Sequence, residues 1–160
     1  MLDDQAKPHD AAHSKVVVFP PLIPATGFAL GVLLERFAPV PAWSWTLRGL
    51  GAIVFLLGAA GLAWMVITMK KARTPIHNSA TPSRLVEHGP FRWTRNPMYL
   101  FGSTAYAGAA LFLVHPWSLA LLPAVLLATH FGVVRREEVF LEAHFGETYR
   151  QYMGHVRRWI

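Results

Sequence analysis

The chain has 160 residues, of which 53% are hydrophobic and only 15% charged, whereas a soluble domain usually carries about 25% charged residues. The charges are clustered and leave long uncharged stretches, a pattern typical of a membrane protein, and the absence of cysteine excludes disulfides, thiolate metal sites and a cysteine nucleophile. The formal net charge of +6 favours a membrane surface over nucleic acid as a partner, because the basic residues flank apolar runs.

Four apolar runs follow one another along the chain. They extend from Val16 to Phe37, from about Trp45 to Met69, from Met98 to Val114 and from Trp117 to Val134. Each is close to the roughly 20 residues that cross a bilayer, and backbone groups in lipid must be hydrogen-bonded within their own segment, so the runs are expected to be helices. We therefore predict an all-α polytopic membrane protein with about four transmembrane helices. It would form a single domain over residues 1–160, with a mobile tail at residues 1–14.

Two of the helix starts are marked by proline. Asn96 is expected to cap the third helix, with Pro97 in its first turn, and Pro116 is expected to open the fourth. The dipeptide His115-Pro116 leaves room only for a tight turn. The third and fourth helices are therefore predicted to form a hairpin.

The connector from Lys70 to Arg95 sets the expected orientation. It contains six basic residues and one acid, Glu87, whereas residues 38–44 carry no charge. Basic loops remain on the cytoplasmic side of a membrane. This places the connector, both termini and the pair Glu137-Glu138 in the cytoplasm, in what we expect to be a prokaryotic inner membrane.

The last part of the chain is expected to be an amphipathic cytoplasmic helix. Its apolar residues recur at helical spacing, as Val134, Leu141, Phe145, Tyr149, Tyr152 and Val156. Glu138 falls on this stripe and Glu137 lies one step around the helix. A buried carboxylate is costly without a partner. Two interpretations remain: a salt bridge with Arg135, Arg136 or an arginine of the connector, or a contact with a cationic or hydroxyl-rich ligand.

His130 is a candidate catalytic residue inside the fourth apolar run. It precedes Glu137 by seven residues and Glu138 by eight, so in an α-helix all three would share a face. A histidine within a membrane span suggests a function, either as a general base for an amine or hydroxyl acceptor or as a hydrogen-bonded core residue. No pair of histidines has the spacing of a metal site, so no metal is expected.

Several short motifs occur in a characteristic order and spacing. They are Leu85-Val86, Gly89-Pro90-Phe91-Arg92, Arg95-Asn96-Pro97-Met98-Tyr99, Glu137-Glu138 and Phe145-Gly146-x-x-Tyr149-x-x-Tyr152. Each is common by itself. Together they resemble the integral-membrane methyltransferases of the isoprenylcysteine carboxyl methyltransferase and phospholipid N-methyltransferase group. The resemblance covers residues 73–160, about half of the chain.

The resemblance implies S-adenosylmethionine as the methyl donor and a pocket for it at the cytoplasmic end. The residues that correspond to this pocket are Ser83, Arg84, Leu85, Val86, Gly89, Phe91, Asn96, Pro97, Met98, Tyr99, Glu137 and Glu138. Carboxylates and aromatic faces suit the sulfonium and ammonium cations of this cofactor, and backbone N–H groups at a helix start can bind its polar groups. The resemblance favours Glu137 as the cofactor ligand, whereas the apolar stripe places Glu138 inward.

The implied acceptor is a lipophilic molecule that enters from the bilayer. The isoprenylcysteine enzymes have an arginine where this chain has Val133, and they tend to have histidine in place of Asn96. These departures favour a phospholipid amine or another small lipid, although Arg135 and Arg136 leave a carboxylate acceptor open. The alternatives are a nicotinamide-dependent membrane reductase, for which the chain looks short, and a non-catalytic small membrane protein.

Overall fold

The computed structural model describes residues 20–41, 44–74 and 84–160, and these ranges contain helices and no strand. The elements are α1 (Leu22–Phe37), α2 (Trp45–Lys71), the 3₁₀-helix η1 (Gly89–Arg92), α3 (Pro97–Leu113), α4 (Pro116–Thr129), the π-helix η2 (His130–Val134), α5 (Arg135–Phe145) and α6 (Glu147–His155). The all-α class is therefore confirmed for the described ranges. The expected tail at residues 1–14 and the pocket residue Ser83 lie outside them.

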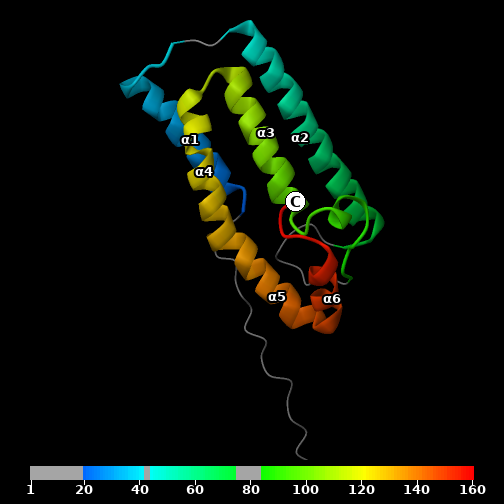
Figure 1. Cartoon of the computed structure of the whole chain (residues 1–160). Coiled ribbons are helices and arrows are strands. Elements are labelled where there is room, and N and C mark those ends of the chain that lie inside the picture. Colours follow the sequence, from blue (N-terminus) through cyan, green and yellow to red (C-terminus); the bar gives the residue numbers. More distant parts are fainter. Residues whose placement is uncertain (1–19, 42–43, 75–83) are drawn as a thin grey trace, which may run out of the picture.

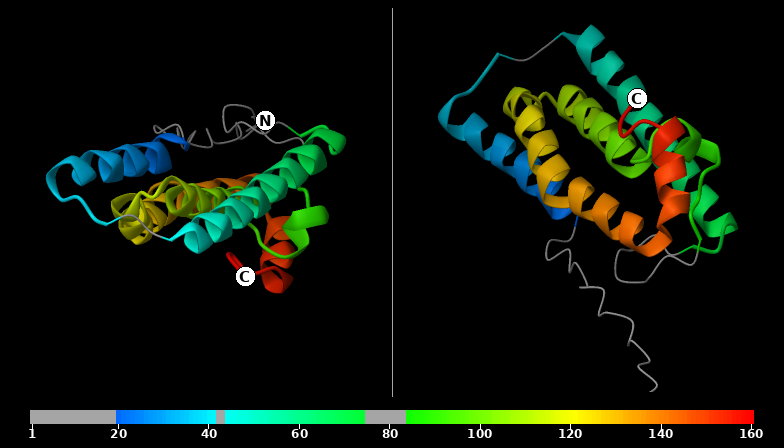
Figure 2. Two further views of the ribbon diagram at one scale, coloured as in Figure 1. Left: turned by 90° about the horizontal axis from the view of Figure 1, so that it is seen from above. Right: turned by 60° about the horizontal axis from the view of Figure 1, so that its bottom comes forward.

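The long helices pack in two pairs that run side by side. Helix α2 packs against α3 and α1 packs against α4, while α3 and α4 are joined by a tight turn (Figure 1). Helices α5 and α6 lie at the other end of the molecule from this turn, and the chain then returns towards the start of α3 (Figure 2). This return brings the C-terminal segment to the end of α3 that carries the Asn96-Pro97 motif.

Two helical segments are long and apolar enough to cross a membrane by length and composition, Trp45–Lys71 and Pro116–Phe145. Helix α1 has 16 residues and α3 has 17, which is short of the roughly 20 residues that a perpendicular span needs. The first predicted run also begins at Val16, outside the described residues. Four spanning helices therefore stay a prediction.

Small residues allow the paired helices to approach closely. A Cβ atom on Gly58 of α2 would collide with the backbone of Ala105 in α3, and one on Gly108 of α3 would collide with the backbone of Phe55 in α2. Helices α1 and α4 meet in the same way at Gly31 and Ser118. Contacts of this kind stabilise helix pairs in membranes through close packing of their backbones.

The predicted hairpin is confirmed, but the predicted cap of α3 is wrong. Pro116 opens α4, and the preceding turn places Val114 in the left-handed region with φ 63°. Asn96 occupies the position before α3, yet its side chain makes no capping hydrogen bond. Its amide group instead donates hydrogen bonds to Glu138 and to the C-terminal segment.

The single amphipathic helix predicted after Val134 is also wrong, because the chain breaks at Gly146. This residue has φ 55° and ψ −125°, a conformation open to glycine and strained for other residues. The apolar stripe is therefore divided between α5 and α6, which contact each other. Tyr149, Tyr152 and Val156 form a buried cluster against which Leu141 and Phe145 pack.

Candidate functional site

Glu138 is buried, with 7% of its surface exposed, and is surrounded by cationic and amide donors. Its Oε2 accepts a 2.8 Å hydrogen bond from Nε of Arg158 and forms an ion pair with Nη2 of the same side chain at 2.7 Å. Its Oε1 lies 3.4 Å from Nη2 of Arg95 and accepts a 3.4 Å hydrogen bond from Nδ2 of Asn96. Because Arg95 belongs to the connector, the predicted pairing of a glutamate with a connector arginine is confirmed. The charge of Glu138 is therefore matched by two arginines of this chain.

The segment after α6 is bound to the start of α3 by its backbone. The carbonyl oxygen of Arg158 accepts hydrogen bonds from Oγ1 of Thr94 at 3.0 Å and from Nδ2 of Asn96 at 3.1 Å. The amide of Arg95 donates to the carbonyl of Arg157 at 3.0 Å. The segment that contains Arg157 and Arg158 therefore forms one wall of the site.

The side chain of Arg158 remains charged. Its hydrogen bond to Glu138 raises its pKa above the usual range.

Glu137 has a different environment from its neighbour. The Tyr99 hydroxyl donates a 2.9 Å hydrogen bond to Oε2 of Glu137. No residue of the described ranges donates a hydrogen bond to its Oε1, which is also not a fully buried atom. Tyr99 itself is held by Val133 and Val134, which are fully buried. Glu137 is thus fixed through one oxygen and leaves the other available to a ligand.

His130 lies in the π-helix η2, directly before α5. Its Nδ1 is buried and finds no hydrogen-bond partner among the described residues, so the interpretation as a hydrogen-bonded core residue gains no support. Its ring lies 5.9 Å from the ring of Trp159, which packs against the cluster around Tyr99. A π-helix turns less per residue than an α-helix. The seven residues from His130 to Glu137 therefore turn by less than two α-helical turns, so the α-helical spacing behind the predicted shared face does not apply to this stretch. The shared face of His130 with the two glutamates stays a prediction.

The connector reaches the site through the tyrosines of the C-terminal cluster. The Tyr152 hydroxyl donates a 2.7 Å hydrogen bond to the carbonyl oxygen of Phe91, and Leu85 packs against the cluster. Burial, followed by the charge of Glu138, raises the pKa of Tyr149 above its usual value. Tyr149 is thus a neutral phenol close to the glutamates.

The remaining predicted residues take different positions. Val86 and Pro97 are buried, and Met98 packs against the Tyr99 cluster. Gly89 has φ 64° and lies against Thr68 of α2. Arg84 is exposed. Within the described ranges, no hydrogen bond or ion pair joins Arg84 or Gly89 to the glutamates.

Sequence reasoning missed four residues that shape the site. They are Thr94, Arg95, Arg158 and Trp159. Arg95 belongs to the quoted Arg-Asn-Pro motif and could have been named from it. Arg158 and Trp159 follow the last periodic residue, and no sequence signal shows that the chain returns to α3. Among the described residues, no three His, Asp or Glu side chains come together as a metal site.

Comparison with known proteins places this arrangement in a family. A family model described as phospholipid methyltransferase matches residues 47–148, from α2 to the start of α6. A protein of Haemophilus influenzae, described as uncharacterized, is 34% identical over 68 residues, which are 42% of this chain and 82% of that protein. The matched residues include both glutamates, Asn96 and Tyr99. The family implies a methyltransferase, and with the two apolar helices it indicates a membrane location. The chain belongs to the phospholipid methyltransferase family.

Proposed function

We propose that the protein transfers a methyl group from S-adenosylmethionine to a lipophilic acceptor in the membrane. The observation that carries this proposal is the contrast between the two glutamates. Glu138 is neutralised by Arg95 and Arg158, whereas among the described residues Glu137 is held by the hydroxyl of Tyr99 alone and keeps one oxygen uncommitted. A half-buried carboxylate of this kind is a suitable partner for a cation.

The residues present fit the proposed cofactor. S-adenosylmethionine carries a sulfonium and an ammonium group, and both are attracted by a carboxylate and by aromatic faces. Glu137 supplies the carboxylate, and Tyr99 supplies an aromatic ring beside it. Met98 lies in the first turn of α3, where backbone N–H groups have no partner within the helix and can bind an anionic group.

The chain's own residues would mainly position and shield the reactants. When bound, S-adenosylmethionine supplies a methyl group on a sulfonium centre, ready for in-line displacement by a nucleophile. Tyr99 orients Glu137, and the ion pairs of Glu138 fix the start of α3 against α5. An amine acceptor must lose a proton, and the buried Nδ1 of His130 has no other partner among the described residues. Packing of Trp159 on the Tyr99 cluster would help to exclude water.

The acceptor we favour is a phospholipid amine or another small lipid rather than an isoprenylcysteine carboxylate. Val133 has no exposed surface and packs with Tyr99, so the position that would carry an arginine in the isoprenylcysteine enzymes is apolar here. Arg135 and Arg136 are exposed. We further propose that the site and both termini face the cytoplasm, because the connector concentrates basic residues.

The cofactor part is tested by calorimetry of the purified full chain in detergent with S-adenosylhomocysteine. The wild type is expected to bind, and Glu137→Gln to bind about 10- to 100-fold more weakly, because a hydrogen bond to a charged group contributes about 1.5–3 kcal/mol. Glu142→Gln is the matched control on the same helix, since it loses only a surface pair with Arg150. Absence of binding to the wild type, or equal binding by Glu137→Gln, would contradict the proposal.

The acceptor part needs a separate screen. Radiolabelled S-adenosylmethionine is incubated with the protein and membrane lipid extracts, and the products are separated by chromatography. Label in a lipid fraction that contains amines is the expected result. Label that appears only in a prenylated peptide supplied in parallel would overturn the choice of acceptor and leave the cofactor assignment intact.

A further inference from the structure

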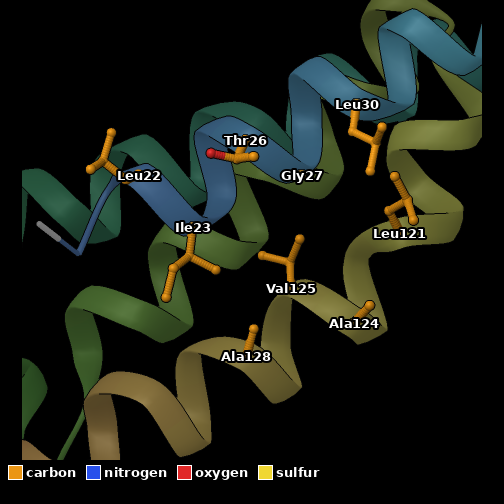
Figure 3. Close-up of a pocket in the computed structure, with 9 residues that line it drawn as sticks. All are labelled: Leu22, Ile23, Thr26, Gly27, Leu30, Leu121, Ala124, Val125 and Ala128. Atoms are coloured by element: carbon orange, nitrogen blue, oxygen red, sulfur yellow. The ribbon is translucent and has the colours of Figure 1, made fainter. Parts of the chain in front are cut away.

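An apolar groove of about 390 Å³ lies between α1 and α4 (Figure 3). Its floor is formed where Gly27 touches Val125, because a Cβ atom on this glycine would collide with the valine side chain. The other lining residues are apolar except for one threonine, and none is charged: Leu22, Ile23, Thr26, Leu30, Leu121, Ala124 and Ala128. The groove therefore offers its occupant dispersion contacts and no ionic partner.

The size of the groove decides what kind of molecule fits. Its volume lies near the lower end of the range of small-molecule sites, about 300–1,000 Å³. One turn of an α-helix is about 5.4 Å long and 10 Å across, which is about 400 Å³. The groove could therefore hold at most about one turn of a packed helix. On α4 it extends from Leu121 to Ala128, about 10 Å along the axis, and a slender alkyl chain suits this elongated shape.

The groove adjoins the candidate site through one side chain. Ile23 lines the groove and also packs against the buried cluster of Tyr99, Val133 and Val134. The same side chain approaches Gly132 of η2. From Ala128 to Glu137 the distance along the helix is about 13 Å at the usual rise per residue. This interval is of the order of a phospholipid head group and its glycerol.

We propose that the groove between α1 and α4 binds one acyl chain of the lipid whose head group reaches the cofactor proposed at Glu137. This inference rests on the proposed function, which it extends from the reacting group to the tail of the acceptor. Ile23 lies at the boundary between the groove and the candidate site. Specificity for a lipid then arises at two separate places, the cofactor site at the head group and a groove of alkyl width at the tail.

The test is native mass spectrometry of the full chain with 1-palmitoyl-2-oleoyl phosphatidylethanolamine after detergent removal in the gas phase. The wild type is expected to retain one lipid. Ala124→Trp should lower this retention at least tenfold, because the larger side chain fills the groove. Ala63→Trp is the matched control, since Ala63 is exposed on α2 and is not a groove residue. It should retain the lipid as the wild type does.

Binding of S-adenosylhomocysteine, measured for each variant, separates this inference from the proposed function. If Ala124→Trp binds the cofactor as the wild type does but loses the lipid, the result supports the groove as the site of the acyl chain. Loss of both in Ala124→Trp indicates a folding defect, and Ala128→Leu, a smaller change in the same groove, then decides. Equal lipid retention by the groove and control variants overturns the inference. A dimer that the groove variants convert to monomers also overturns it, because the occupant is then a second copy. If the wild type binds no cofactor but the groove variants still lose lipid, only the proposed function fails.

Discussion

The Tyr99 hydroxyl donates its hydrogen bond to Glu137 across a separation of 38 residues, with 2.9 Å between the oxygens. This bond joins the first turn of α3 to the first turn of α5, so the candidate site is built from the starts of two helices. The two glutamates therefore have different partners: Glu138 pairs with Arg95 and Arg158, and Glu137 accepts the Tyr99 hydrogen bond, which would orient it for the proposed cofactor.

Removal of the tyrosine hydroxyl should weaken cofactor binding while leaving the fold intact. Tyr99→Phe is expected to bind S-adenosylhomocysteine about fivefold more weakly, because a neutral hydrogen bond contributes about 1 kcal/mol. Calorimetry in detergent measures the change. Tyr106→Phe is the control, since its hydroxyl bonds the Ser118 carbonyl far from the glutamates. Equal dissociation constants for wild type and Tyr99→Phe would show that the hydroxyl does not orient the ligand.

Loss of Arg95 should destabilise the protein. Its side chain is 10% exposed and pairs with Glu138, whose side chain alone is 8% exposed. Breaking a buried pair usually costs 3–5 kcal/mol. We expect Arg95→Ala to lower the free energy of unfolding by about 3 kcal/mol, at the low end because Arg158 still faces the carboxylate. Chemical unfolding in detergent micelles measures it. Arg92→Ala, at an exposed position of the same segment, should change little; similar losses in both variants would contradict the assigned role.

Two glycine substitutions should change stability in opposite directions. Gly89→Ala forces a side chain into a left-handed conformation with φ 64° and places its Cβ atom 2.8 Å from Oγ1 of Thr68. The conformation alone costs about 1–2 kcal/mol. Gly49→Ala, in α2 with no atom within 4 Å of the new Cβ, should instead stabilise by about 0.5–1 kcal/mol. Thermal unfolding measures both, and a destabilised Gly49→Ala together with an unaffected Gly89→Ala would refute the account.

The contact between α2 and α3 depends on Gly108. A side chain there meets the backbone of Phe55, which cannot move without shifting α2. Overpacking of this kind typically costs 1–3 kcal/mol. Gly108→Ala is expected to lower the unfolding free energy by about 2 kcal/mol. Gly102→Ala, on the same helix but with open space around the new Cβ, should be tolerated. If both variants unfold alike, the close approach of the helices is not limiting.

Sequence reasoning succeeded where a signal was local or repeated. Pro116 was read correctly as the start of α4, because proline suits the first helical turn. The inward position of Glu138 followed from the apolar stripe, and its pairing with a connector arginine was one of the predicted alternatives. Both helices of the hairpin are apolar along nearly their whole length, so the continuous apolar runs in the sequence are enough to locate them.

The errors have physical causes that spacing does not report. Gly146 breaks the C-terminal stripe by adopting a positive φ, while the apolar residues keep their helical intervals on both sides. Asn96 was read as a cap because it precedes a helix, but the buried charge of Glu138 and the carbonyl of Arg158 bind its amide. The return of Arg158 to Thr94 joins residues 64 apart in the chain. This contact forms only when the helices between the two residues have packed, so no local pattern in the sequence predicts it.

The π-helix η2 takes up one residue more than an α-helix would over the same rotation, because its hydrogen bonds reach one residue further along the chain. Deletion of one residue from His130–Val134 would therefore let this stretch become α-helical while α5 keeps about the same orientation about its axis. Glu137 would still face Tyr99, and Glu138 would still face Asn96. Conversion of all five residues to an α-helix, without a deletion, would instead turn α5 by roughly 100° and take both carboxylates away from these partners. A gap at this position in a comparison of related chains is therefore compatible with the same pair of carboxylates.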